Sequence, residues 1–143
     1  MPPFTRFVIS DLLLAEVIEH GRRELPNECC GLLAGRIAEG VGTVTTRFTI
    51  GNDAASTTEY ETNARDLFVA FRAMRRDGAE LLAIYHSHPA SEPVPSRRDI
   101  ERNTYGESVV HLIVGFANAE VTVRAWWLTE MNYREVEITA EHP

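Results

Sequence analysis

The sequence contains no lysine, and all fourteen of its basic residues are arginine. Together with 21 acidic residues they give a formal net charge of −7. Proteins that bind nucleic acid through their overall charge are normally basic, so this composition argues against such a role. A coding bias toward arginine codons is the simplest explanation of the missing lysines. A second interpretation is that the chain offers no lysine side chain for modification.

Cysteine and long apolar runs are also scarce. The only two cysteines, Cys29 and Cys30, are adjacent, so the sequence predicts no disulfide framework and a reducing compartment. They also lack the C-x-x-C spacing of common zinc sites. No run approaches 18 consecutive apolar residues, and the N-terminus lacks the basic segment of a signal peptide. We therefore expect a cytoplasmic protein with no membrane span.

The remaining composition is that of a globular protein. A chain of 143 residues with 44% hydrophobic residues is long enough for one core, so we expect a single domain over residues 1–143. Capping signals predict a helix from Ser10 to Pro26, a second from Asn63 to Gly78 and a short third from Ser96 to Asn103. Apolar and β-branched runs predict strands at residues 28–37, 42–50, 80–88, 108–116, 120–128 and 133–139. This order favours an α/β fold with a mixed central sheet flanked by helices.

The sequence also predicts whether several side chains are buried or exposed. The second helix should present one apolar face, formed by Leu67, Phe68, Phe71 and Met74. Trp126 and Trp127 alternate across a strand, so one should pack in the core and the other should be exposed or at an interface. Cys29 and Cys30 are expected to pack in the interior. Among the histidines, we expect His20 and His142 at the surface and His111 as a hydrogen-bonded core or edge residue.

The stretch "HSHPASEPVPSRRD", residues 86–99, combines residue types that bind metals. His86 and His88 lie two apart on a strand, so both imidazoles face the same side. They stand at the end of an apolar strand, where open α/β sheets place their ligands. A catalytic zinc ion needs three protein ligands and an open position, and Asp99 on the next helix can supply the third. Hydrogen-bonded core histidines and a capping box formed by Ser96 and Asp99 are the structural alternative, but the complete ordered pattern favours a metal site.

The same stretch resembles the H-x-H-P-x6-S-x-x-D signature of the JAMM, or MPN-plus, metalloprotease family, in particular its small single-domain prokaryotic members. Glu28 in "NECCGLLAG" occupies the place of the family's upstream glutamate, and the resemblance covers nearly the whole chain. It implies a cytidine-deaminase-like α/β fold and one Zn²⁺ per chain, held by His86, His88 and Asp99. It also implies hydrolysis of an amide or isopeptide bond after the C-terminus of a ubiquitin-like protein.

In this interpretation Glu28 is the general base and Ser96 donates its hydroxyl to the developing oxyanion. The expected substrate is a ubiquitin-like or sulfur-carrier β-grasp protein with a Gly-Gly tail, and neither nucleic acid nor a membrane is an expected partner. The favoured leaving group is a single amino acid such as cysteine, whose carboxylate could pair with an arginine of the last helix: Arg97, Arg98 or Arg102. The sequence leaves a lysine leaving group and the oligomeric state open.

Three other functions are less favoured. A non-catalytic MPN scaffold is expected to lack metal ligands, and this chain has all of them. The DNA-repair-associated branch resembles the motif, but its additional N-terminal helical domain has no counterpart here. A zinc nucleoside deaminase needs H-x-E followed by P-C-x-x-C, whereas His88 stands at the position of the glutamate and no such cysteine pair occurs.

Overall fold

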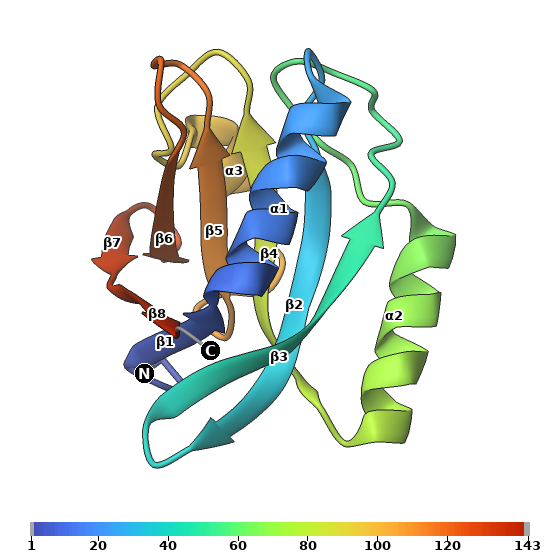
Figure 1. The fold of residues 1–143 in the computed structure, drawn as a ribbon, viewed down its shortest axis with the longest axis vertical. Coiled ribbons are helices and arrows are strands. Elements are labelled where there is room, and N and C mark those ends of the chain that lie inside the picture. The colour runs from blue at the N-terminus through green and yellow to red at the C-terminus, as the bar shows by residue number, and fades with distance from the viewer. Residues whose placement is uncertain (1, 142–143) are drawn as a thin grey trace.

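A computed structural model describes residues 2–141, and the eight strands among them form one sheet in the order β7-β6-β5-β4-β2-β3-β1-β8. In chain order the elements are β1 (Arg6–Ser10), α1 (Asp11–Glu24), β2 (Cys30–Ala38), β3 (Val41–Ile50), α2 (Ala64–Asp77), β4 (Glu80–His88), α3 (Arg97–Glu101), β5 (Val110–Gly115), β6 (Thr122–Leu128), β7 (Tyr133–Val136) and β8 (Ile138–Glu141) (Figure 1). β1 runs parallel to β3 and β8, β4 runs parallel to β5, and the other neighbours are antiparallel. The predicted mixed α/β architecture is therefore confirmed.

The helices begin where the sequence predicts. The side chain of Ser10 accepts the backbone N–H of Leu13, and that of Asn63 accepts the N–H of Asp66. Each bond satisfies one of the donors that the first helical turn leaves unpaired. Gly78 ends α2 with φ of 65°, a left-handed conformation that glycine adopts without steric cost.

The sheet has a helix on each face. α1 lies across one face and contributes Val17 to its core, whereas α2 contributes Ala70 and Met74 to the core of the other face (Figure 1). Neighbouring residues of β4 divide between the two, since Tyr85 belongs to the α1 side and Ile84 to the α2 side. His86 lies two residues after Ile84 on the same strand, so its side chain also faces the α2 side of the sheet.

Two features of the strand prediction are wrong. β1 was not expected, and it takes its place only by pairing in parallel with β3 and β8. The segment 133–139, expected as one strand, divides into β7 and β8. β7 pairs with β6 at one edge of the sheet, and β8 pairs with β1 at the other edge. Both differences depend on pairing partners that are remote in sequence.

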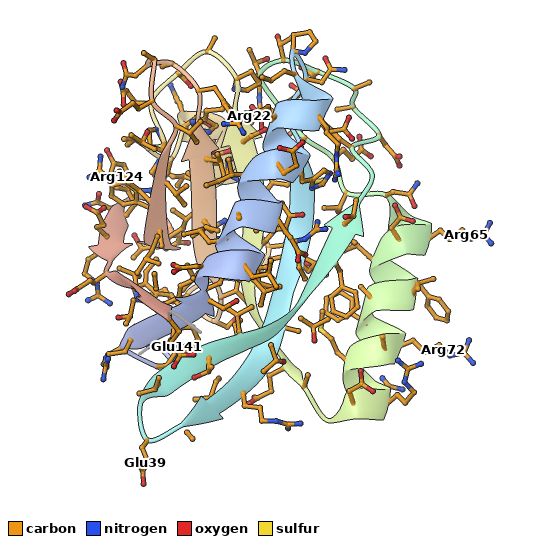
Figure 2. The ribbon with its side chains drawn as sticks, viewed as in Figure 1. Arg22, Glu39, Arg65, Arg72, Arg124 and Glu141 are labelled. Carbon is orange, nitrogen blue, oxygen red and sulfur yellow. The ribbon has the colours of Figure 1, made fainter. Side chains whose placement is uncertain are left out.

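The expected apolar face of α2 is only partly correct. Met74 is buried and Leu67 is partly buried, but Phe68 is 66% exposed and Phe71 is 39% exposed. Figure 2 shows Arg65 and Arg72 on the solvent side of the same helix, pointing away from the sheet. No helix among the described residues is long and apolar enough to cross a membrane.

Both tryptophans are buried, so the expectation that one of them would be exposed is wrong. Trp127 packs on the α1 side, with its ring 5.0 Å from that of Phe4. Trp126 packs on the opposite face, beneath the proline-rich loop that follows β4, and its indole N–H donates to the carbonyl oxygen of Pro93 at 2.9 Å. The sheet is covered on both sides at this point, which alternation within one strand cannot reveal.

His20 is buried rather than at the surface. Its Nδ1 lies 2.7 Å from the Tyr85 hydroxyl, to which Arg47 also donates at 3.0 Å. The Tyr85 hydroxyl thus links His20 and Arg47 in one hydrogen-bond network. Burial and the Arg47 charge lower the pKa of His20 to about 4. His142 lies outside the described residues.

Candidate metal centre

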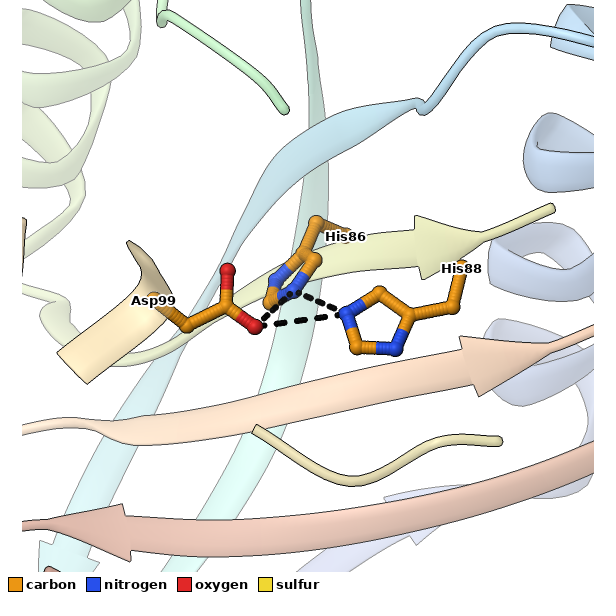
Figure 3. Close-up of side chains that lie close together, drawn as sticks. All are labelled: His86, His88 and Asp99. Carbon is orange, nitrogen blue, oxygen red and sulfur yellow. Dashed lines mark hydrogen bonds and ion pairs between the residues drawn. The ribbon is translucent and has the colours of Figure 1, made fainter. Parts of the chain in front are cut away.

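The structure brings His86, His88 and Asp99 together at the carboxyl end of β4 (Figure 3). The Nε2 atoms of the two histidines are 3.2 Å apart, and each lies 3.2 Å from Oδ2 of Asp99. Both imidazoles are buried, and the Asp99 side chain is 9% exposed. Three electron-pair donors at this spacing require a proton or a cation between them to offset their repulsion.

This triangle fits a tetrahedral metal ion. Bonds of about 2.0–2.1 Å to a tetrahedral zinc ion place neighbouring ligand atoms about 3.3 Å apart, close to the observed separations. Two imidazoles and one carboxylate also form a ligand set found in catalytic zinc sites, in which the fourth position stays open. The residues present therefore fit a metal ion held by His86, His88 and Asp99.

The protonation of His88 is fixed by a neighbouring carbonyl. Its Nδ1 lies 2.8 Å from the backbone oxygen of Glu92, and a carbonyl can only accept, so Nδ1 carries the proton. The Nε2 lone pair is then free for a metal. Glu92 belongs to the proline-rich loop that Trp126 fastens through the Pro93 carbonyl. Trp126 thus supports the contact that orients His88, a role that the sequence did not indicate.

Asp99 belongs to the expected capping box and to the metal cluster at the same time. Its Oδ2 accepts the backbone N–H of Ser96 at 2.8 Å, while the Ser96 hydroxyl oxygen accepts the N–H of Asp99 at 3.1 Å. Burial opposes ionisation, but the two histidines and the Ser96 N–H hold the pKa of Asp99 well below its usual range. The two interpretations of Asp99 are therefore compatible, because the cap fixes the carboxylate that faces the histidines.

Glu28 lies on the same face as the two imidazoles. Cys30 is paired with His86 across β2 and β4, and Glu28 precedes Cys30 by two residues. The Glu28 side chain is buried, and its Oε1 has no hydrogen-bond partner within residues 2–141. Burial raises the pKa of this carboxyl to about 8, with His88 opposing the shift and Asp99 adding to it. A carboxyl with such a pKa exchanges protons readily near neutral pH.

Ser96 stands at the start of α3 and is partly exposed. Its oxygen accepts the Asp99 N–H, which leaves the hydroxyl proton free to be donated elsewhere. The structure thus places the five residues singled out from the sequence on neighbouring segments near the carboxyl end of β4: Glu28, His86, His88, Ser96 and Asp99.

A cavity of about 510 Å³ adjoins Asp99. It lies between α3 and the loop of residues 51–63, which joins β3 to α2, and its wall includes Tyr60, Leu67 and Tyr105. His111 also lines this cavity; it is buried as expected, but neither ring nitrogen has a hydrogen-bond partner within residues 2–141. Burial, together with the nearby His86 charge, lowers the pKa of His111 to about 3.

The arginines of the α3 region already have partners. Arg98 and Arg102 approach the two carboxylate oxygens of Glu59 at 3.0 and 3.7 Å, and Arg97 pairs with Glu101 at 2.9 Å. Each arginine of the expected basic rim thus pairs with a glutamate of the chain itself. Glu59 belongs to the 51–63 loop, so these ion pairs join that loop to α3.

The adjacent cysteines pack in the interior, as expected. Both are free and buried, on opposite sides of the sheet, and burial raises the pKa of Cys29 to about 11 and that of Cys30 to about 12. Both thiols therefore stay protonated at neutral pH, which argues against a role as thiolate nucleophiles.

Two residues beside the cluster were missed by the sequence interpretation, which treated the 51–63 loop as an ordinary polar connection. Tyr60 stacks on His86, and Asn52 donates to the backbone oxygen of Glu28 at 3.0 Å. Gly51 and Asn52 directly follow the predicted strand 42–50, and from the sequence they indicated only that the strand ends there. Nothing in the local sequence distinguishes such residues from ordinary loop residues.

A family model described as prokaryotic homologs of the JAB domain matches residues 11–129. The chain belongs to this family. The resemblance to small prokaryotic JAMM proteins that the motif indicated is therefore confirmed.

Several curated proteins resemble the chain over much of its length. A desampylase from Haloferax volcanii is 32% identical over 132 residues, which cover 92% of this chain and 91% of the relative. A CysO-cysteine peptidase from Mycobacterium tuberculosis is 35% identical over 97 residues, covering 68% of this chain and 65% of the relative. A probable TtuB-protein conjugate cleaving protease from Thermus thermophilus is 41% identical over 90 residues, covering 62% and 57%.

The fold is also similar to that of solved structures. The solution structure of a protein from Desulfitobacterium hafniense superposes with a TM-score of 0.86 at 28% sequence identity, covering 96% of this chain and 94% of that one. A protein from Salinibacter ruber gives a TM-score of 0.70 at 27% identity, covering 93% and 90%.

Proposed function

We propose that this prokaryotic JAB protein is a zinc-dependent peptidase or isopeptidase. Its substrate is a ubiquitin-like or sulfur-carrier protein, and it hydrolyses the amide bond that follows the C-terminal Gly-Gly tail. The observation that carries the proposal is the triangle of ligand atoms from His86, His88 and Asp99 beside the buried carboxyl of Glu28. The relatives named as a desampylase, a CysO-cysteine peptidase and a TtuB-conjugate protease support the substrate class.

The residues divide the chemistry among them. A zinc ion held by the triad would polarise the scissile carbonyl and lower the pKa of a water molecule. Glu28 takes the proton of the attacking water and delivers it to the leaving nitrogen, and a pKa near neutrality suits both transfers. Ser96 donates a hydrogen bond from its hydroxyl to the carbonyl oxygen as negative charge develops on that oxygen. His86 and His88 present their Nε2 atoms toward Asp99, and the Glu92 carbonyl holds the His88 proton on Nδ1.

The leaving group is either a free amino acid or a lysine side chain. Release of an amino acid places a carboxylate close to the scissile bond, where Arg98 or Arg102 could bind it. Both arginines pair with Glu59, but exposed ion pairs of this kind contribute only about 0–1 kcal/mol. A substrate carboxylate can therefore replace Glu59, whereas a lysine isopeptide requires no such exchange.

The test uses the small β-grasp protein encoded nearest to this gene, prepared as a C-terminal cysteine adduct and as a lysine isopeptide. Zinc-loaded protein should release the intact Gly-Gly carrier from at least one of them, as detected by mass spectrometry. Glu28→Gln is the matched control, because it keeps the metal ligands and removes the base. If Arg98→Ala and Arg102→Ala lose cleavage of the cysteine adduct but keep cleavage of the lysine isopeptide, the leaving group is a free amino acid.

Two results would contradict the proposal. Zinc-loaded wild-type protein that cleaves neither substrate would favour the non-catalytic scaffold, as would equal turnover by wild type and Glu28→Gln. The complete ligand set and the buried carboxyl of Glu28 support the enzyme over the scaffold, because a scaffold needs neither.

A further inference from the structure

One side chain holds the 51–63 loop in place at its start. Nδ2 of Asn52 donates to the backbone oxygens of Glu28 at 3.0 Å and Glu59 at 3.2 Å. Its Oδ1 accepts two backbone N–H groups of the loop, those of Ala54 at 3.0 Å and Glu61 at 2.9 Å. Three of these hydrogen bonds fix the path of the loop itself, and the bond to the Glu28 oxygen ties the loop to the segment that carries Glu28.

This loop carries Tyr60 onto a metal-binding histidine. The Tyr60 ring stacks on the His86 imidazole, with centroids 4.7 Å apart and an angle of 28° between the planes. Tyr60 also packs against the α2-side core and lines the cavity beside Asp99. The Tyr60 ring is therefore held by the core and by its stacking against the His86 imidazole.

The two histidines of the cluster are oriented in different ways. Histidines that bind metals nearly always donate their second ring N–H to an oxygen, which fixes the plane of the ring. His88 follows this rule through the Glu92 carbonyl. His86 does not, because its buried Nδ1 has no hydrogen-bond partner within residues 2–141. Without another constraint, its imidazole could turn about χ2 and move Nε2 away from Asp99 and His88.

We infer that Tyr60 is a positioning residue for His86 and that its stacked ring takes the place of the missing hydrogen bond. The inference rests on the proposed metal centre and concerns metal affinity, not proton transfer. Because Asn52 anchors the Tyr60 loop to the Glu28 carbonyl, one loop positions both a metal ligand and the segment bearing the base. Residues that orient metal ligands typically contribute about 10–100-fold to metal affinity.

The experiment measures zinc binding directly, by competition with a chromophoric chelator, and records the absorption spectrum of the Co²⁺-substituted protein. Tyr60→Leu removes the aromatic face, Tyr60→Phe keeps it, and Tyr105→Leu is the matched control. Tyr105 lines the same cavity and packs against the same core cluster, and within residues 2–141 neither a hydrogen bond nor a ring contact joins it to His86. Asn52→Ala loosens the loop without altering the ring.

Tyr60→Leu should weaken zinc binding by about 10–100-fold and change the Co²⁺ spectrum. Asn52→Ala should act in the same direction with a smaller loss, and it serves as the test if Tyr60→Leu does not fold by circular dichroism. Tyr60→Phe and Tyr105→Leu should bind like wild type. Unchanged affinity in Tyr60→Leu would overturn the inference, as would an equal loss in Tyr60→Phe or in Tyr105→Leu. Wild-type protein that binds no zinc would overturn the proposed metal centre itself.

Discussion

The buried carboxyl of Glu28 should make the stability of the metal-free protein depend on pH. Its pKa is about 8 in the folded chain, against 4.5 for an unperturbed glutamate. The folded protein therefore keeps a proton that the unfolded chain releases between these values. A group with a raised folded pKa stabilises the fold fully below its unfolded pKa, and this contribution is lost as the pH rises toward the folded pKa. Metal-free protein should accordingly lose stability from about pH 4.5 to about pH 8.

The size of the effect follows from the pKa difference. One pKa unit corresponds to about 1.4 kcal/mol, so the Glu28 contribution should fall by about 3 kcal/mol between about pH 5 and pH 7.5. Glu28→Gln removes the titration while keeping a neutral side chain of similar shape. The difference in unfolding free energy between wild type and variant should then isolate the pH dependence that Glu28 contributes, because the two proteins are otherwise the same.

The assay is urea unfolding of both proteins after chelator treatment, at several pH values. Any constant cost of burying the glutamine amide shifts the variant equally at every pH and leaves the slope intact. Parallel stability curves for the two proteins across this range would refute the account, because they would mean that Glu28 is hydrated or ionised in the folded chain.

Three further changes test the cluster and its supports. Wild-type protein should carry one zinc per chain by elemental analysis and His88→Ala should carry almost none; equal metal contents would exclude His88 as a ligand. Ser96→Ala should keep its zinc but lose about 10²–10³ in rate. Because the substitution also removes a helix cap, it should cost about 1 kcal/mol in a denaturation curve, and an unchanged rate would exclude Ser96 as the oxyanion donor. Trp126→Phe should weaken zinc binding in a chelator competition by about tenfold, since the Pro93 carbonyl loses its donor and the loop orienting His88 loosens. Wild-type affinity would show that the loop holds His88 without that bond.

Local chemistry in the sequence was sufficient for much of the fold. Ser10, Asn63 and Gly78 mark helix ends through bonds and dihedral angles within a few residues, and the structure has the helices there. The spacing of His86 and His88 on a strand is equally local, because side chains in a strand alternate whatever lies around it. The return of Asp99 was predictable for a related reason: Ser96 starts a helix, and a capping residue fixes the direction of the first turn.

Burial was predicted less well, because it depends on what covers each face of the sheet. His20 was expected at the surface, yet a partner 65 residues away, Tyr85, buries it. Trp126 and Trp127 alternate as expected, but both sides of β6 are covered, one by the α1-side core and the other by the proline-rich loop. The same limitation concealed β1, whose partners follow it by 30 residues or more.

The sequence by itself determined the candidate ligands, the helix boundaries and the mixed α/β class, because periodicity, capping and ligand spacing act over a few residues. Only the tertiary structure decided how the ligands are oriented. Tyr60 stacks on His86, which follows it by 26 residues. Trp126 donates to the carbonyl of Pro93, which precedes it by 33 residues, and so supports the loop beside His88. Contacts of this kind arise when separate strands and loops pack together, and no short-range pattern encodes them. The raised pKa of Glu28 likewise results from burial, which exists only once the sheet, the loop and α3 have assembled around it.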